Sequence, residues 1–228
     1  MKRIFYTGAL CFCLFSTNLL SSQAQGVTVS GDGQGIYFVG NTYSNLTGSP
    51  YLYEDWAKGY VKLANGTVYR DLFVKYDQVK DELIFLNEKK SPQLFSQPVT
   101  EFTIVNINEG VETKRTFING FQSMGDANSK TYYELLVAGN TKLVKHISKK
   151  VVEERGNGSI LVNKQVKETA KYYLSMADNL YPIKRDQKAI LVTLKSKATE
   201  LTSFIKENNL NLKKDGDLIT LIYYYNTL

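Results

Sequence analysis

The side chains of this sequence that could perform chemistry are almost all carboxylates. Two groups stand out, Glu54 with Asp55, and Asp81 with Glu82. A glycoside hydrolase needs two carboxyl groups about 5–10 Å apart in space and no local motif, so a carboxylate-dependent hydrolase of carbohydrate or cell-wall material is one hypothesis. The competing interpretation is that the stretch Asp77–Asp81 is a turn, where aspartate is favoured for its local hydrogen bonds.

Other catalytic chemistries lack the residues they require. The sequence has one histidine, His146, two cysteines, Cys11 and Cys13, and no serine in a Gly-x-Ser-x-Gly setting. One histidine with carboxylates is an unusual ligand set for zinc. The segments Ser30–Gly35 and Asp215–Asp217 are rich in Gly and Asp, but neither has the complete spacing of a calcium loop. We therefore predict no catalytic residue, no metal site and no cofactor.

Tyrosine is the compositional excess of the chain, with 16 residues against a single tryptophan. Tyrosine stacks on sugar rings and anchors protein interfaces, although it is also a good strand residue. Tyr51, Tyr53 and Trp56 follow a Gly-rich stretch and the Ser49-Pro50 break, so we expect them to form part of an exposed binding surface. The leading hypothesis is a non-enzymatic binding or structural module whose partner is an envelope protein, a glycan or an apolar ligand.

The first 24 residues place the protein outside the cytoplasm. Lys2 and Arg3 precede the apolar run Ile4–Leu20, and a small-residue site ends at Ala24, which is the order of a secretory signal peptide. Cleavage there removes both cysteines, so the mature chain has no disulfide or thiol chemistry. No later segment approaches the ~20 apolar residues of a transmembrane helix. We expect an exported protein, periplasmic or extracellular and soluble after cleavage, with no nucleic-acid partner; the oligomeric state stays open.

Beyond residues 1–24 we predict an α+β protein that forms one compact unit. Residues 25–50 are a flexible lead-in rich in Gly, Ser and Asn, residues 51–185 an antiparallel β region and residues 186–228 a helical region packed on it. Runs rich in Val, Ile, Tyr, Phe and Thr alternate with turn signals, which is typical of a β-meander. Asn65-Gly66 favours a type I′ turn. Asn108-Glu109-Gly110 and Gly156-Asn157-Gly158 mark further reversals, and Lys142–Ser148 is one of the predicted strands. Connections this short require antiparallel neighbours. Strong curvature of the sheet is compatible with this pattern.

Alternation along the strands indicates which faces are buried. Leu72, Val74 and Tyr76 alternate with polar residues, and Phe73 breaks that pattern on the opposite face. The run 132–137 is apolar on both faces for part of its length, so another element must cover its second face.

The tail supplies that cover as three short amphipathic helices. Asp186 begins a segment with apolar residues at helical spacing, a second repeat ends at Asn208-Asn209, and Asp215 or Asp217 can cap a last helix. None of these helices could bury its apolar stripe alone, so we expect them to pack on each other and on the sheet.

Two stretches resemble a known family. The segment Tyr51–Gly59, followed by a strand–Asn-Gly–strand unit, and the ending 209–226 with its run Leu-Ile-Tyr-Tyr-Tyr-Asn are similar to exported Gram-negative envelope proteins with no assigned activity. The resemblance covers most of the mature chain. It implies an exported single unit and brings no ligand or catalytic residue with it.

Overall fold

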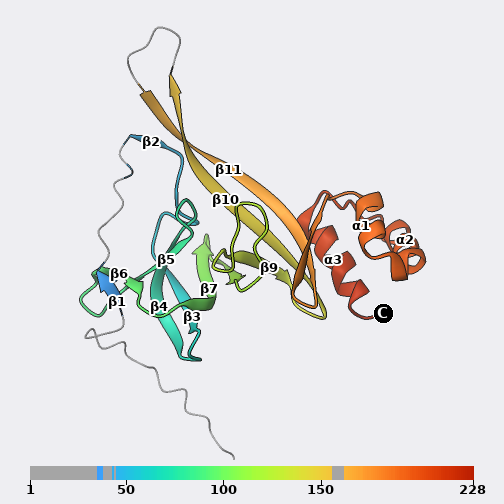
Figure 1. Cartoon of the computed structure of the whole chain (residues 1–228), viewed down its shortest axis with the longest axis horizontal. Coiled ribbons are helices and arrows are strands. Elements are labelled where there is room, and N and C mark those ends of the chain that lie inside the picture. The colour runs from blue at the N-terminus through green and yellow to red at the C-terminus, as the bar shows by residue number, and fades with distance from the viewer. Residues whose placement is uncertain (1–34, 38–42, 44, 156–161) are drawn as a thin grey trace, which may run out of the picture.

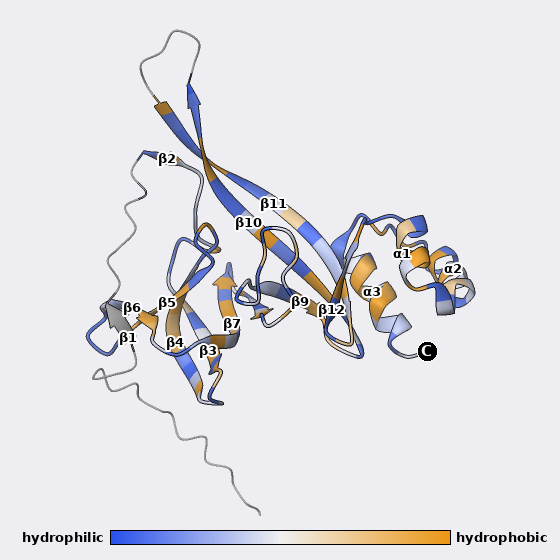
Figure 2. Cartoon of the chain, in the orientation of Figure 1, coloured by the Kyte–Doolittle hydropathy of each residue, from blue (hydrophilic) through white to orange (hydrophobic). Residues whose placement is uncertain are grey.

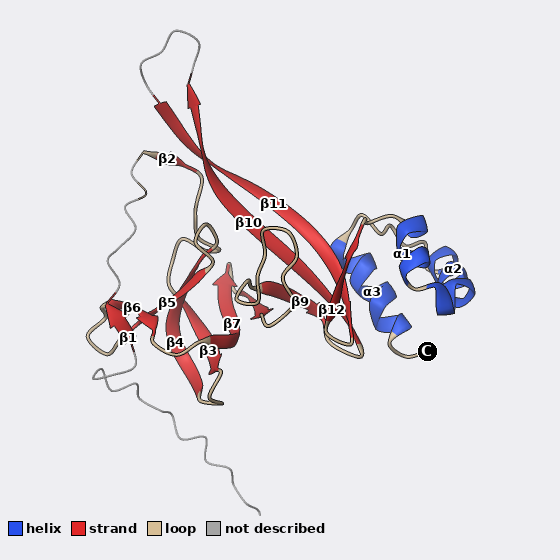
Figure 3. Cartoon of the chain, viewed as in Figure 1, coloured by secondary structure: helices blue, strands red, loops and turns tan. Residues whose placement is uncertain are grey.

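The computed structural model describes residues 35–37, 43, 45–155 and 162–228. It consists of a large sheet with three short helices at the C-terminal end (Figures 1 and 3). The predicted signal peptide and much of the lead-in 25–50 lie outside the described residues. Two short pieces of that lead-in pair with the sheet, as strands β1 (Gly35–Tyr37) and β2 (Leu46–Thr47).

The sheet is built from two antiparallel meanders that lie side by side. Along the described chain the strand order is β1-β6-β5-β4-β3-β7-β8-β9-β10-β11-β12, so β7 returns to pair with β3 rather than with β6. The predicted antiparallel meander is thus confirmed in its main part, while the parallel pairing of β2 with β11 makes the sheet mixed. The sheet is open, with β1 and β12 at its ends. The remaining strands are β3 (Ala57–Leu63), β4 (Val68–Asp77), β5 (Glu82–Leu86), β6 (Pro92–Phe95), β7 (Val99–Asn108), β8 (Val111–Ile118), β9 (Tyr133–Val137), β10 (Thr141–Arg155), β11 (Val162–Met176) and β12 (Asn179–Ile183).

The tight turns follow the sequence signals, with one correction. Glu109 and Gly110 both have positive φ, 50° and 80°, between β7 and β8, as a two-residue hairpin turn requires. At Asn65-Gly66 only Gly66 has positive φ, at 86°, so the type I′ prediction is wrong. The side-chain oxygen of Asn65 instead accepts a hydrogen bond from the backbone N–H of Thr67 at 3.0 Å, a local bond that suits a wider turn closed by glycine.

Strands β10 and β11 form a hairpin far longer than the sequence predicted. Each has 15 residues, and they pair along their whole length. The far end of the hairpin extends beyond the other strands (Figure 1), and β2 pairs with Lys164 and Gln165 of β11 in this half. Ion pairs cross its two strands, Lys164 with Glu153 at 3.7 Å and Lys167 with Glu154 at 2.6 Å. The predicted reversal at Gly156–Gly158 lies outside the described residues.

The first meander curls around an aromatic core. Tyr76 lies at its centre, with ring centroids 5.1 Å from those of both Phe102 and Phe117. Val74 and Tyr76 are buried and Leu72 packs against the cluster, as the alternation predicted. Phe73 points to the other side of the sheet and is 47% exposed.

The tail covers one face of the second meander, as predicted. Its helices are α1 (Gln187–Thr193), α2 (Ala198–Glu207) and α3 (Asp215–Tyr225), with a short 3-10 turn at Lys195–Lys197. Leu221 of α3 is fully buried in a cluster that includes Val137, Leu143 and Leu174 of the sheet. Figure 2 shows α3 coloured mainly as hydrophobic. The other face of β9 is covered by the loop around Phe121, which packs on Tyr133.

The helix caps are partly as predicted. Asp186 caps α1 by accepting a hydrogen bond from the N–H of Ala189 at 2.9 Å. The cap position of α3 is Lys214, without a side-chain cap bond, so the prediction of Asp215 or Asp217 as the cap is wrong. Asp215 instead accepts hydrogen bonds from three side chains: Lys145 of β10 at 3.0 Å, Tyr172 of β11 at 2.7 Å and Arg185, which precedes α1, at 2.7 Å. These contacts fix the start of α3 to the sheet.

Candidate functional site

The segment that carries the three predicted binding residues runs beside the end of β4. Tyr51 forms an isolated antiparallel bridge with Asp77, and the N–H of Leu52 donates to the carbonyl of Tyr76 at 2.9 Å. Lys149 of β10 holds the segment from the other side, since its ammonium donates to the carbonyls of Ser49 at 3.1 Å and Tyr51 at 2.7 Å. The segment is therefore fixed between the two meanders, and burial lowers the pKa of Lys149.

The rings of Tyr51 and Trp56 both contact the ammonium group of Lys75. The ammonium of Lys75 lies 4.9 Å from the Tyr51 ring centroid and 5.2 Å from that of Trp56, within the range of cation–π attraction. It also donates to the carbonyl of Glu54. Both rings are half-buried, so the three side chains form a fixed aromatic and cationic corner.

Tyr53 lies differently from its two predicted companions. Its ring packs against the aromatic core, and its hydroxyl is one of the groups that, after Glu134, raise the pKa of the Arg115 side chain. Arg115 in turn makes a two-pronged ion pair with Glu134, with N–O distances of 2.7 and 2.6 Å. The structure thus divides the predicted set: Tyr51 and Trp56 stay together near the surface, and Tyr53 joins a half-buried polar network.

The corner continues onto an uncovered side of the first meander. The register places Phe73, Lys58, Val105 and Lys114 directly across from one another on β4, β3, β7 and β8, so they share one side of the sheet. We call this side the outer face. Its aromatic, apolar and basic residues are Trp56, Lys58, Tyr60, Arg70, Phe73, Lys75, Val105, Ile107 and Lys114, and Glu112 lies opposite Ile107 on the same side.

The outer face exposes apolar side chains beside basic residues, two of which form ion pairs: Lys58 with Asp71 at 3.9 Å and Lys114 with Glu112 at 2.9 Å. Phe73 is 47% exposed and Ile107 is 67% exposed. The guanidinium of Arg70 lies 5.1 Å from the ring centroid of Tyr60. The sequence predicted Trp56 as a binding residue. It marked Phe73 only as a break in the polar–apolar alternation of its strand, and that break was the one sign of an exposed aromatic residue here.

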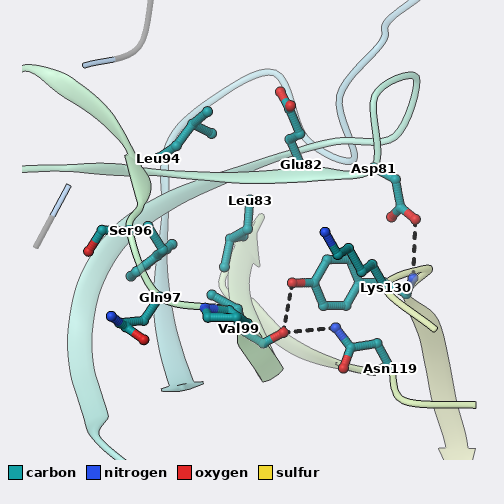
Figure 4. A pocket seen from close by; sticks show the side chains of 12 residues that line it. Asp81, Glu82, Leu83, Leu94, Ser96, Gln97, Val99, Asn119 and Lys130 are labelled. Atoms are coloured by element: carbon teal, nitrogen blue, oxygen red, sulfur yellow. Dashed lines mark hydrogen bonds between the residues drawn. The ribbon is translucent and has the colours of Figure 1, made fainter. Parts of the chain in front are cut away.

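Two of the candidate carboxylates, Asp81 and Glu82, line the same pocket but do not face each other. A pocket of about 330 Å³ is lined by Asp81, Glu82 and Tyr132, among others. Figure 4 shows the side chains of Asp81 and Glu82 pointing in different directions. Asp81 accepts hydrogen bonds from the Tyr76 hydroxyl and from the N–H of Tyr132 at 3.2 Å. Burial raises its pKa, although these hydrogen bonds lower it in part.

The other carboxylates have local structural roles or are exposed. Asp77 accepts hydrogen bonds from the N–H groups of Val79 and Lys80 at 2.9 and 3.0 Å, which confirms the predicted turn. Glu54 and Asp55 are exposed. Over the described ranges, no three His, Cys, Asp or Glu side chains gather as a metal site would require. The Gly-rich stretch Ser30–Gly35 lies almost entirely outside the described residues.

His146 lies on β10 against an aromatic side chain rather than beside a nucleophile. Its ring centroid is 5.2 Å from that of Tyr133, and burial together with the charge of Lys171 lowers its pKa. The imidazole is therefore neutral at neutral pH.

Comparison with known protein families, with curated proteins and with solved structures finds no match to this chain. In the part of the chain that the structure describes, the helices are too short and too polar to cross a bilayer.

Proposed function

We propose that this protein is an exported, non-enzymatic binding module whose outer face takes up another protein of the cell envelope. The observation that carries the proposal is the exposed Phe73, which lies on a bare sheet face beside the Trp56–Lys75 corner. Sheets that bury only one face normally present polar residues on the other. Here Phe73 and Ile107 are exposed beside three half-buried aromatic or apolar residues, Trp56, Tyr60 and Val105, and such a patch is an expected property of an interaction surface.

The composition of the outer face favours a protein partner. Trp, Tyr and Arg dominate the binding energy of protein interfaces, and Trp56, Tyr60 and Arg70 supply all three on adjacent strands. Lys58 and Lys114 lie at its exposed positions, and each has a carboxylate neighbour, Asp71 at 3.9 Å and Glu112 at 2.9 Å, so the surface around the apolar residues carries charges of both signs. The Lys75 corner also fixes the Trp56 ring before binding, so little side-chain freedom is lost there on association.

The proposal is tested by comparing outer-face and carboxylate variants of the exported protein. Cross-linking in the native host should yield a discrete adduct with the wild-type chain, and Trp56→Ala combined with Phe73→Ala should remove it. Truncation of such anchors costs on the order of 1–4 kcal/mol of affinity, or roughly a fivefold to thousandfold weaker complex. Tyr223→Ala, which removes a 54% exposed ring from α3, is the matched control and should leave the adduct unchanged.

The carboxylate arm decides between binding and hydrolysis. Asp81→Asn and Glu82→Gln should leave the adduct intact, and the wild-type protein should not cleave envelope glycans. Glycan cleavage that disappears in Asp81→Asn while the fold is retained would replace the binding proposal with the hydrolase alternative. Loss of the adduct in the Tyr223→Ala control would also contradict the role of the outer face.

A further inference from the structure

Strand β11 has an open edge over residues 166–171. One of its edges pairs with β10 along the whole strand, and the other pairs with β2 at Lys164 and Gln165 and with β12 at residues 172–176. Within the described part of the chain, no strand pairs with that second edge between these two contacts. Strand β2 does not continue along it, because Gly48 follows β2 with a φ of 87° and turns the chain away. The open edge therefore presents backbone N–H and C=O groups with which a further strand can pair.

The open edge is accessible to another chain. Residues 167–171 are all exposed, and this part of β11 lies at the outside of the sheet in Figure 1. The strand at the end of the sheet, β12, carries Pro182, and proline protects an edge because it cannot donate a backbone hydrogen bond. The stretch 166–171 contains no proline. It can therefore accept a strand by β-strand addition, in which main-chain hydrogen bonds supply affinity and alternate side chains supply specificity.

One side of this edge carries lysines that favour an acidic guest. Lys167 and Lys171 share that side of β11, and Lys150 of β10 lies directly opposite Lys167, an arrangement of like charges that destabilises a strand pair. Lys167 and Lys150 have exposed carboxylate neighbours, Glu154 at 2.6 Å and Asp126 at 3.7 Å, and exposed pairs of this kind contribute little. Lys171 forms no ion pair with any described residue. A carboxylate beside the edge is therefore attracted to Lys171 and eases the repulsion between the other two lysines.

The other side of the edge favours apolar residues in the guest. Val166 and Ala170 lie on that side, opposite Val151 and Ile147 of β10. Glu168 lies between them and is 3.8 Å from Lys149, so a cation of the hairpin already balances its charge. A guest strand in which acidic and apolar residues alternate therefore matches both sides of the edge.

The same charges disfavour a second copy of this edge as the guest. In an antiparallel pair, side chains that lie opposite each other are on the same side of the sheet, so a two-fold pairing is centred on Glu168 or on Thr169. The first register sets Glu168 opposite Glu168 of the second copy, and the second register sets Lys167 opposite its Lys171. Each register brings like charges together, which identifies the guest as a different chain.

We propose that residues 166–171 of β11 accept an extended segment of another protein, in which acidic residues alternate with apolar ones and lie beside Lys167 and Lys171. The segment adds a strand between β2 and β12. This edge is separate from the outer face and does not depend on the partner proposed for that face, so each proposal can fail without the other.

Binding of defined peptides to the exported protein tests this inference. The probe is a short peptide with blocked ends in which valine and glutamate alternate, and the comparison peptide has lysine in place of glutamate. In an NMR titration the glutamate peptide should bind at least tenfold more tightly than the lysine peptide. Lys167→Gln combined with Lys171→Gln should weaken binding of the glutamate peptide at least tenfold. Lys188→Gln combined with Lys195→Gln removes the same charge from exposed positions near α1 and should leave the affinity unchanged.

Hydrogen exchange separates strand addition from simple attraction between charges. Alternate backbone N–H groups of a strand point to opposite edges, so every second amide in 166–171 should exchange at least tenfold more slowly when the glutamate peptide binds. The same peptide with methylated backbone nitrogens keeps its charge but donates no backbone hydrogen bond, and it should bind at least tenfold more weakly.

Several results would overturn the inference. These are no binding of the glutamate peptide, equal affinity for the lysine or the methylated peptide, equal weakening in the Lys188 and Lys195 control, and unchanged exchange in 166–171. Slower exchange of the same amides at higher protein concentration, without any peptide, would overturn it as well, because a second copy would then occupy the edge.

Discussion

Replacement of Leu221 by alanine is expected to destabilise the whole sheet, not only the helical tail. Leu221 is fully buried between α3 and the sheet, in the cluster that includes Val137, Leu143 and Leu174. A Leu-to-Ala change at a buried site removes hydrophobic contacts and leaves a cavity, at a cost of 2–5 kcal/mol in comparable cores, and we expect about 3 kcal/mol here. That is a large share of the roughly 5–15 kcal/mol by which domains are stable.

Urea unfolding with two probes measures this loss and shows how far it spreads. Circular dichroism at 222 nm follows the helices, and the fluorescence of Trp56, the single tryptophan, follows the first meander. Because hydrogen-bonded strands connect β4 with β12 without a break, both probes should shift to lower urea by the same amount, as expected for one cooperative unit.

Tyr223→Ala is the control on the same helix, since Tyr223 is exposed and surface substitutions usually change stability by less than about 0.5 kcal/mol. The reasoning is refuted if Leu221→Ala and Tyr223→Ala have equal effects. It is also refuted if Leu221→Ala shifts the dichroism midpoint and leaves the Trp56 fluorescence midpoint in place.

Two further substitutions test the contacts that join the segments. Burial raises the pKa of Asp215, but hydrogen bonds from Tyr172 and Lys145 outweigh this effect, so the pKa is lowered. The charged form of Asp215 therefore stabilises the fold above about pH 3.9, the unfolded value. That stabilisation is lost as the pH falls through the folded pKa. Asp215→Asn should thus be less stable than wild type at pH 6, with the difference shrinking at pH 3 in urea unfolding, and a difference that grows at low pH would contradict this. Lys149→Met removes both hydrogen bonds to the carbonyls of residues 49 and 51 and should speed proteolysis of the segment 49–56 at least about tenfold. The control Lys150→Met should leave the cleavage rate unchanged. Equal cleavage rates in the two variants would refute the anchoring role of Lys149.

Local signals in the sequence predicted the hairpins and the buried alternation well. Turn residues at Glu109-Gly110 and Asp77–Asp81, and the cap at Asp186, act through bonds to near neighbours, so their effect is readable without the rest of the chain. The Asn65-Gly66 turn was mispredicted because Asn65 bonds the chain through its side chain and does not adopt positive φ.

Pairing between distant segments was beyond the sequence patterns. Strand β7 pairs with β3 across three intervening strands, and no turn residue encodes that choice. The far half of the β10–β11 hairpin was missed because charged side chains such as Glu154 and Lys167 replace the apolar alternation that marks a strand, and cross-strand ion pairs take the place of a core.

The candidate site shows the same division. The residue types at Tyr51 and Trp56 predicted an aromatic surface, but their shared contact with Lys75 depends on a segment laid beside β4. Asp215 was expected at a helix cap from its position alone, and its three partners come from β10, β11 and the segment before α1. Such contacts become visible only once the strands are placed.

Site-specific photo-cross-linking in the exporting host tests the proposed binding surface most directly. A photoreactive residue is placed at Phe73 on the outer face or at Tyr223 on α3, two aromatic positions that are 47% and 54% exposed. The outer-face proposal predicts a discrete protein adduct from position 73 and none from position 223. An adduct from position 223 alone, equal adducts from both positions, or none from position 73 would contradict it.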